Sequence, residues 1–177
     1  MFLIPGFIIS IITFPGVIIH ELAHQIFCRL FRVPVYEVKY FQFANPSGYV
    51  LHESPENPWK TFMISIGPFL VNTFLGMIII APAAIELITF SDYSNPLNLI
   101  LGWVGFSTLM HAFPSTGDAK VMIDNILKNR NVNLIFKIIV SPIIGLIYLG
   151  AIGSVVWLDA LYAVLIAMTI PNLFLLF

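Results

Sequence analysis

Residues 14–28 read Phe-Pro-Gly-Val-Ile-Ile-His-Glu-Leu-Ala-His-Gln-Ile-Phe-Cys and contain the pattern H-E-x-x-H. On a helix, residues four apart lie one above the other, so His20 and His24 can offer two imidazole nitrogens to one metal ion. Glu21 lies one residue further round, beside the position where the metal would hold water. The spacing therefore predicts two metal ligands and a general base.

The residues before this motif are almost entirely apolar. From Phe2 to Ile19 the only polar side chains are Ser10 and Thr13. A charged side chain near the middle of a membrane helix costs about 2.5 to 3.5 kcal/mol even on the lenient insertion scale, so ionisable residues there usually have a functional reason. The alternative interpretation, two structural histidines beside a solvated glutamate, fits this apolar setting poorly.

Composition places the whole chain in the membrane. Hydrophobic residues make up 59% of the 177 residues and charged residues 10%, with a mean hydropathy of +0.95. Soluble domains carry roughly a quarter charged residues, so we expect an integral membrane protein. The net charge of -1 excludes a basic surface for nucleic acid, and a single cysteine excludes an intrachain disulfide. The first apolar segment carries the metal motif, so it is not expected to be a cleavable signal.

We predict an all-α polytopic membrane protein with about five transmembrane segments and a small membrane-associated β-hairpin after the first. A single membrane-embedded metalloprotease domain is expected to fill residues 1–177, and Pro5 and Pro15 predict kinks in its first crossing. Branched and aromatic residues followed by turn residues predict the hairpin over about residues 35–52, as a structural flap or a substrate-binding edge. The predicted crossings are residues 2–27, 61–90, 97–113, 134–157 and 158–177.

The basic residues predict the orientation. With five crossings, all eight fall in or beside the two polar stretches on one side of the membrane, and the positive-inside rule makes that side cytoplasmic. We therefore expect a multi-pass protein with its N terminus outside, its C terminus cytoplasmic and its active site near the cytoplasmic face. The basic residues are Arg29, Arg32, Lys39, Lys60, Lys120, Lys128, Arg130 and Lys137.

A catalytic zinc takes three protein ligands and keeps one position for water, so one zinc per chain requires a third donor. Asp118 follows a Pro- and Gly-bearing break at the end of an apolar crossing, and such a break can return a carboxylate to membrane depth. The alternative is that Asp118 is the N-cap of a helix from Ala119 onward. The other candidates are His111, His52, Glu53, Glu56 and Cys28. Cys28 lies one helical turn beyond His24, so it is too far from His20 for all three to bind one ion.

A lone amide, Asn72, also lies at membrane depth in the second long apolar run. An amide in such a position most often forms hydrogen bonds between helices. From the residues alone, this interhelical role is the favoured interpretation of Asn72.

Four features together carry a resemblance to a known family. They are His20-Glu21-Leu22-Ala23-His24, Gly48-Tyr49-Val50, Gly67-Pro68-Phe69-Leu70-Val71-Asn72 and the Pro-containing segment that ends in Asp118. Across roughly residues 14–119 the chain resembles the site-2 protease family of intramembrane zinc metalloproteases, as a small member without a PDZ-like domain. The last two apolar segments match nothing specific.

The resemblance implies a role for each matching residue. His20, His24 and Asp118 would bind zinc, Glu21 would activate water, and Asn72 would contact the substrate near the site. One strand of the hairpin would pair with the extended substrate. The sequence departs from the family in having Gly117 before Asp118 rather than Asp before Gly, and in having His111 where the family has a polar Asn. His111 is therefore expected to be a transition-state donor or an alternative metal ligand.

The implied function is hydrolysis of peptide bonds within or near the transmembrane segments of membrane proteins, as in regulated intramembrane proteolysis. The expected partners are a substrate transmembrane helix and membrane lipid; the sequence does not predict an oligomeric state. Two alternatives stay open, a catalytically silent relative that binds transmembrane helices and a component of a metal transporter. Glu21 argues against both, because neither function needs a base beside the metal.

Overall fold

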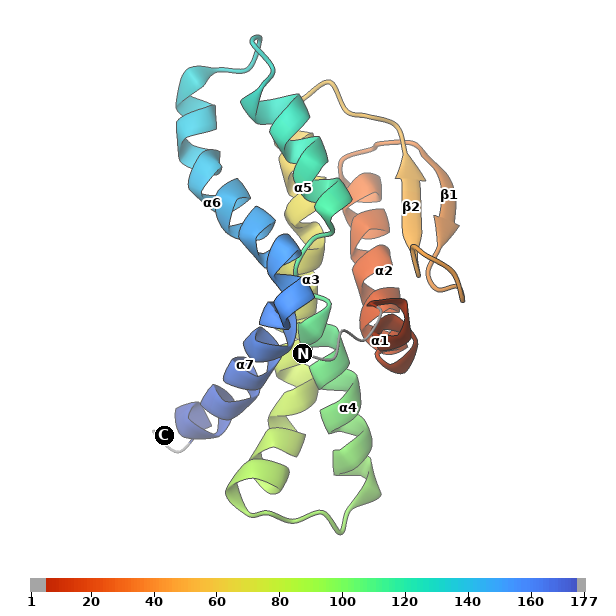
Figure 1. Cartoon of the computed structure of the whole chain (residues 1–177), viewed down its shortest axis with the longest axis vertical. Helices are drawn as coiled ribbons and strands as arrows, with labels where there is room; N and C mark the ends of the chain where they lie inside the picture. Colours follow the sequence, from red (N-terminus) through yellow and green to blue (C-terminus); the bar gives the residue numbers. More distant parts are fainter. Residues whose placement is uncertain (1–5, 175–177) are drawn as a thin grey trace.

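The computed structural model describes residues 6–174 and is mostly helical, with one two-stranded antiparallel hairpin, as predicted (Figure 1). The helices and strands are α1 (Gly6–Ile12), α2 (Phe14–Leu30), β1 (Val35–Lys39), β2 (Tyr49–His52), α3 (Pro58–Ala84), α4 (Pro96–Met110), α5 (Thr116–Met122), α6 (Leu134–Gly153) and α7 (Leu158–Phe174). A π-helical turn extends α3 over Ile85–Thr89, a second extends α5 over Ile123–Leu127, and a 3-10 turn follows α6 over Ser154–Val156.

α3 is the axis of the bundle. Its start is fixed by Asn57, whose side chain accepts a hydrogen bond from Trp59 N at 2.9 Å, and by Pro58 at the first helical position. Its N-terminal half packs against α5 and α6 in an apolar cluster, and its C-terminal half packs against α4 and α7 in a second one. The first cluster contains Phe62, Ile66, Met122, Ile126, Val140, Ile144 and Ile147, and the second contains Ile80, Ala84, Leu109, Met110, Ala163, Ala167 and Ile170.

The other helices are interrupted near the middle of α3. α1 and α2 meet at 93° beside Thr13, α4 is separated from α5 by residues 111–115, and α6 is separated from α7 by a short 3-10 turn. In Figure 1, α5 lies above α4 and α6 lies above α7. Irregular backbone at membrane depth is tolerated where it is buried in protein or lines a cavity, so these breaks mark a candidate site.

The predicted first crossing, residues 2–27, is not one continuous helix. Pro15 lies in the first turn of α2, where its missing N–H is tolerated, and the chain before it turns away as α1. The predicted kink at Pro15 is therefore a full break at Thr13. The predicted kink at Pro5 lies outside the described residues.

Within residues 6–174, two helices are long and apolar enough to cross a membrane, Pro58–Thr89 and Leu134–Val156, and the bent pair α1 and α2 would make a third. α4 is apolar but has only 15 residues, short of the roughly 20 that a crossing needs. α7 packs on α3 and α4, and the Ser154–Val156 3-10 turn and Trp157, whose backbone is left-handed, join it to α6. Five separate full-length crossings are thus not supported by the described residues, because hydropathy does not register where an apolar stretch breaks into shorter helices.

Charge and apolar surface are both distributed unevenly. The eight basic residues lie in α2 and the turn after it, the hairpin, the start of α3, the α5 region and the first turn of α6, which form the upper half in Figure 1. The connection from α3 to α4 at the opposite end carries Glu86 and Asp92 but no basic residue.

α6 presents an exposed apolar face of the kind that lipid covers, with each of Leu134, Ile135, Ile138, Ile139, Leu146 and Leu149 at least 62% exposed.

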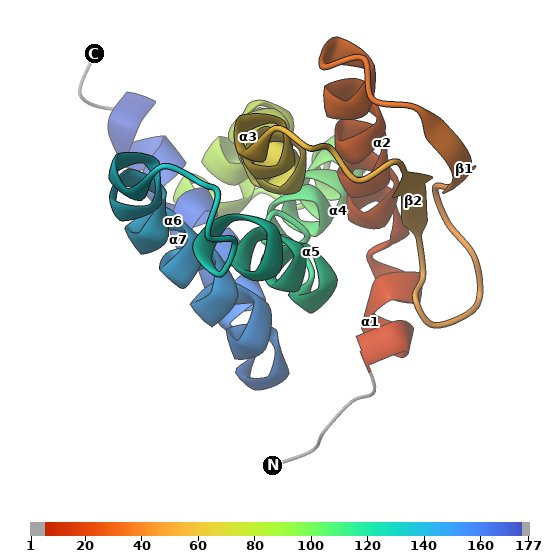
Figure 2. The same ribbon diagram turned by 90° about the horizontal axis from the view of Figure 1, so that it is seen from above.

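The hairpin lies beside α2, as the view from above shows (Figure 2). β1 and β2 pair in antiparallel register, with Val38 opposite Val50 and Lys39 opposite Tyr49. The first strand ends at Lys39, where the chain enters a loop in which Gln42 N donates to Ser47 O at 2.7 Å. Residues 40–48 therefore form a loop at the lower end of the hairpin.

The crossing of α3 and α4 depends on small residues. A Cβ added at Gly105 would come within 2.6 Å of Ile80 Cβ and 2.8 Å of its backbone. We predict that Gly105→Ala destabilises the protein by about 1 to 3 kcal/mol through overpacking, measured as a lower thermal unfolding midpoint by circular dichroism in detergent.

Gly145 on α6 is the matched control, because a Cβ added there would meet nothing within 4 Å. Gly145→Ala should leave the midpoint unchanged or raise it slightly, since alanine favours helix. Equal losses in the two variants would contradict the close crossing at Gly105.

Candidate metal centre

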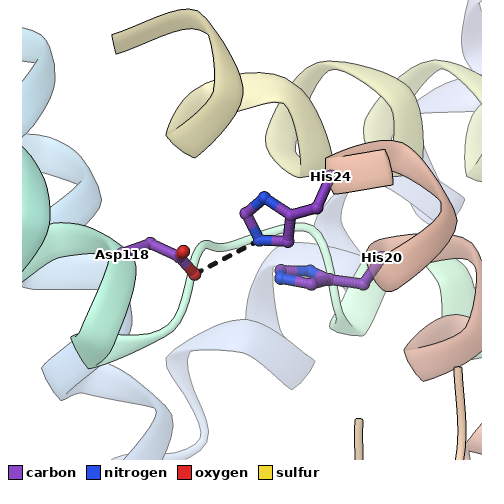
Figure 3. A group of neighbouring side chains, drawn as sticks. All are labelled: His20, His24 and Asp118. Atoms are coloured by element: carbon purple, nitrogen blue, oxygen red, sulfur yellow. Dashed lines mark ion pairs between the residues drawn. The ribbon is translucent and has the colours of Figure 1, made fainter. Parts of the chain in front are cut away.

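His20, His24 and Asp118 come together in the interior of the bundle (Figure 3). Both histidines lie on α2, one helical turn apart, and are buried, while Asp118 comes from the first turn of α5. One ligand atom from each residue lies within 4.8 Å of the ligand atoms of the other two. The structure thus brings together the three predicted ligands from segments almost a hundred residues apart.

The ring orientation of each histidine is set by a backbone carbonyl. His20 Nδ1 lies 2.8 Å from His111 O, and His24 Nδ1 lies 3.0 Å from Ile64 O. A carbonyl oxygen only accepts hydrogen bonds, so each Nδ1 carries the proton and each Nε2 keeps a lone pair for a metal.

Both carbonyls are available because of local helix chemistry. Pro68 lies inside α3 and has no N–H, so the carbonyl of Ile64, four residues earlier, lacks its usual helical partner. His111 directly follows the last residue of α4, where carbonyls also lack intrahelical partners. The Gly67-Pro68 motif therefore has a physical role in orienting His24.

Asp118 is held by a capping box at the start of α5. Its Oδ2 accepts from Ser115 N at 2.9 Å and from Ser115 Oγ at 2.6 Å, while Asp118 N donates to Ser115 Oγ at 3.1 Å. The helix begins at Thr116 and its N-cap is Ser115, three residues before Asp118. The alternative that Asp118 is the N-cap of a helix from Ala119 onward is therefore wrong. The two roles of Asp118 are compatible, because the carboxylate oxygen that accepts from Ser115 also lies 3.4 Å from His24 Nε2.

The donor set fits a catalytic zinc. Two imidazole nitrogens and one carboxylate oxygen form a three-ligand set that leaves a fourth position open. His24 Nε2 lies 3.4 Å from Asp118 Oδ2, which is about the separation of two ligand atoms on one tetrahedral zinc at bond lengths of roughly 2.1 Å.

A cavity of about 540 Å³ opens beside these residues and lies within the usual size range of ligand sites. His20, Glu21 and His111 line it, together with part of α1, the hairpin loop and the α6–α7 connection. Its wall includes residues on either side of the α1–α2 break and residues of the α4–α5 and α6–α7 connections. Glu21 lines the same cavity as His20, one of the metal-ligand residues, as a general base requires.

The hairpin loop closes over Glu21. A Cβ added at Gly48 would come within 2.7 Å of Glu21 Cγ and 3.0 Å of Tyr40 O, so only glycine allows this approach. Tyr40 OH donates to Gln25 Oε1 and ties the loop to α2. The predicted hairpin thus forms a wall of the cavity.

Asn72 is fully buried and holds three segments together. Its Nδ2 lies 3.2 Å from Gly16 O, 3.2 Å from Thr108 O and 3.0 Å from His111 O. It is not among the described residues that line the cavity, and its hydrogen bonds in this structure are interhelical. The implied substrate contact stays a prediction. Because the His111 carbonyl also accepts from His20, Asn72 supports the position of that ligand.

His111 contributes its carbonyl to the centre and turns its ring away. His111 Nε2 lies 2.7 Å from Thr13 Oγ1, and the Thr13 hydroxyl donates to Ile9 O at 2.7 Å. The ring therefore donates to Thr13 and lies outside the three-residue cluster, which does not fit the alternative of a metal ligand. Its other predicted role, as a transition-state donor, stays a prediction.

The remaining candidates lie elsewhere. Cys28 is buried in an apolar cluster with Val33 and Ile64, and His52 Nδ1 bonds to the carbonyl of Glu53. Neither these residues nor Glu56 belongs to the cluster found among the described residues.

The sequence interpretation missed Ser115 and the two backbone carbonyls. Ser115-Thr116-Gly117-Asp118 is a capping-box pattern, so Ser115 was detectable from sequence. The carbonyl of Ile64 was indicated only indirectly, by Pro68 four residues later.

Comparison with known proteins identifies the family. A family described as "Putative zincin peptidase" matches residues 13–131, about two thirds of the chain, and the match includes the H-E-x-x-H motif and Asp118. No curated protein and no solved structure matches the chain. Because the family match covers more than half of its length, the chain belongs to this zincin peptidase family, a family of zinc metallopeptidases.

Proposed function

We propose that the chain is an intramembrane zinc metalloprotease of the site-2 protease type, which hydrolyses peptide bonds within or near transmembrane segments of membrane proteins. The observation that carries the proposal is the convergence of His20, His24 and Asp118 beside Glu21, inside a bundle of apolar helices. A zincin that acted on soluble peptides would have no need of an apolar setting for its metal.

The proposed orientation places the basic half of the molecule at the cytoplasmic face. Ile64, which contacts His24, lies six residues from the start of α3, and Asn72 lies fourteen residues from it. At 1.5 Å per residue, the centre is roughly 10 to 20 Å below the basic end. This depth supports an active site within the membrane and nearer its cytoplasmic side, reached by water through the cavity.

One zinc per chain is the proposed cofactor, held by His20, His24 and Asp118. When bound, it supplies a Lewis acid that makes water a nucleophile at neutral pH and polarises the substrate carbonyl. The ring orientations set by the carbonyls of His111 and Ile64 keep the two Nε2 atoms directed at the ion.

Glu21 is the proposed general base. Its carboxylate accepts a proton from the attacking water and returns it to the nitrogen of the leaving amine as the peptide bond breaks. Packing of the hairpin loop on Glu21 limits its movement and its exposure to bulk water.

The hairpin is the proposed binding edge for the substrate. A substrate helix hides its peptide bonds in its own hydrogen bonds and must unwind before attack. β2 begins at Tyr49, directly after cavity-lining Gly48, so a strand paired with the hairpin would lead into the cavity. Such pairing replaces the hydrogen bonds lost on unwinding.

The proposal predicts about one zinc per chain in protein purified in detergent. His20→Ala, His24→Ala and Asp118→Ala should each lose it, because two remaining ligands do not hold a catalytic zinc. The measurement is metal content by inductively coupled plasma mass spectrometry.

His111→Ala is the matched control, since its backbone carbonyl remains to orient His20. This variant should keep its zinc. Loss of zinc in His111→Ala with retention in Asp118→Ala would move the third ligand to His111 and contradict the assignment.

Glu21→Gln should keep the zinc and lower cleavage of a model transmembrane substrate by a factor of about 100 to 10,000, because the amide cannot accept the proton. Cleavage is measured on gels after reconstitution, with Glu56→Gln in the exposed loop as the control. Full activity of Glu21→Gln would refute the mechanism. Bound zinc without cleavage in the wild type would favour the helix-binding alternative.

Ser115→Ala removes the hydroxyl that donates to Asp118 and should weaken zinc binding by about 10- to 100-fold, as loss of a partner that orients a metal ligand does. Ser115→Thr keeps the hydroxyl and should restore the affinity. Competition with a zinc chelator measures both values, and equal affinities for the alanine and threonine variants would refute the role of the capping box.

A further inference from the structure

The cavity contains one carboxylate that the proposed chemistry does not use. Among the described residues that line it, the ionisable side chains are His20, Glu21, His111 and Asp159. The first three have been placed at the metal centre or beside it. Asp159 lies in the first turn of α7, on the α6–α7 side, whereas the hairpin loop lies on the α2 side (Figure 2).

Asp159 has a local hydrogen bond but no cationic partner in the described part of the chain. Its Oδ1 accepts from Ala160 N at 2.8 Å, as suits a carboxylate at the start of a helix. The ion pairs of residues 6–174 are His24 with Asp118 and Lys128 with Asp124. No lysine or arginine is among the described residues that line the cavity.

Asp159 is partly buried and lines a cavity among apolar helices. Ionisable residues within membrane segments face the bundle interior or a water-filled cavity and mark substrate paths. The start of α7 needs a hydrogen-bond acceptor, which asparagine would also supply, and it favours a negative charge. The charge of Asp159 nevertheless faces a cavity in which no lysine or arginine is among the described lining residues. Its position in the same cavity as Glu21 indicates that the missing cation belongs to the bound molecule.

We infer that Asp159 forms a cation-binding subsite that selects substrates with an ammonium or guanidinium group within a few residues of the cleaved bond. The group is the side chain of a substrate lysine or arginine, or a free amino terminus. The inference rests on the proposed function, because it assigns a substrate class to the same cavity. A charge-assisted hydrogen bond in a partly dehydrated cavity is strong enough to discriminate between substrates.

Asp159→Asn is the test variant, because it keeps the acceptor for Ala160 N and removes the charge. The probes are synthetic apolar peptides that differ at one position, lysine or uncharged norleucine, each with an acetylated amino terminus. A third peptide carries norleucine and a free amino terminus. The lysine position is moved along the peptide to locate the subsite.

Two measurements are made with these peptides, kcat/KM for the active protein and the dissociation constant for the Glu21→Gln variant, with and without Asp159→Asn. We expect a lysine or free-amine peptide to be preferred over the acetylated norleucine peptide by about tenfold or more, and the ratio to fall toward one in Asp159→Asn. Asp92→Asn is the matched control, since Asp92 also accepts from a nearby backbone N–H, that of Ser94 at 2.9 Å, far from the cavity. Its discrimination should equal that of the wild type.

The two readouts separate this inference from the proposed function. Absence of zinc and of cleavage in the wild type would refute the protease, while a charge preference in binding that Asp159→Asn removes would still support the subsite. Equal binding and equal cleavage of charged and uncharged peptides would overturn the inference and leave the protease intact. A preference that survives in Asp159→Asn would also overturn it.

Discussion

The centre depends on two backbone carbonyls that are free to accept from histidine side chains inside an apolar bundle. Ile64 provides one because Pro68 cannot donate to it, and His111 provides the other because α4 has just ended. Without them, two buried imidazoles would have unpaired N–H groups and no fixed orientation. The helix interruptions are therefore part of how a polar site is accommodated in an apolar protein.

The same interruptions organise the rest of the fold. α3 runs past the centre without a break, with one apolar cluster around its N-terminal half and another around its C-terminal half. The breaks in the surrounding helices lie between these clusters and line the cavity with Glu21. Between the two apolar clusters, α2 supplies both histidines and Glu21, and the first turns of α5 and α7 supply Asp118 and Asp159.

The sequence predicted the helical class, the hairpin and the proximity of His20, His24 and Asp118, because each leaves a strong local pattern. It did not predict the number of crossings. Hydropathy registers that a residue is apolar but not the direction of its helix. Pro15 indicated only a kink in the first crossing, whereas the structure has a 93° break at Thr13. The role of Asn72 was also open. A buried amide can form hydrogen bonds with neighbouring helices or with a substrate, and the sequence does not distinguish the two.

Zinc K-edge X-ray absorption on the purified protein reports the atoms around the metal and so distinguishes the possible ligand sets. A centre built from His20, His24 and Asp118 should give two imidazole nitrogens at roughly 2.0 to 2.1 Å, carboxylate and water oxygens at about 2.0 to 2.2 Å, and four ligands in all. A sulfur at about 2.3 Å would assign the site to Cys28 instead, and a third imidazole would assign it to His111. Either result would contradict a centre built from His20, His24 and Asp118.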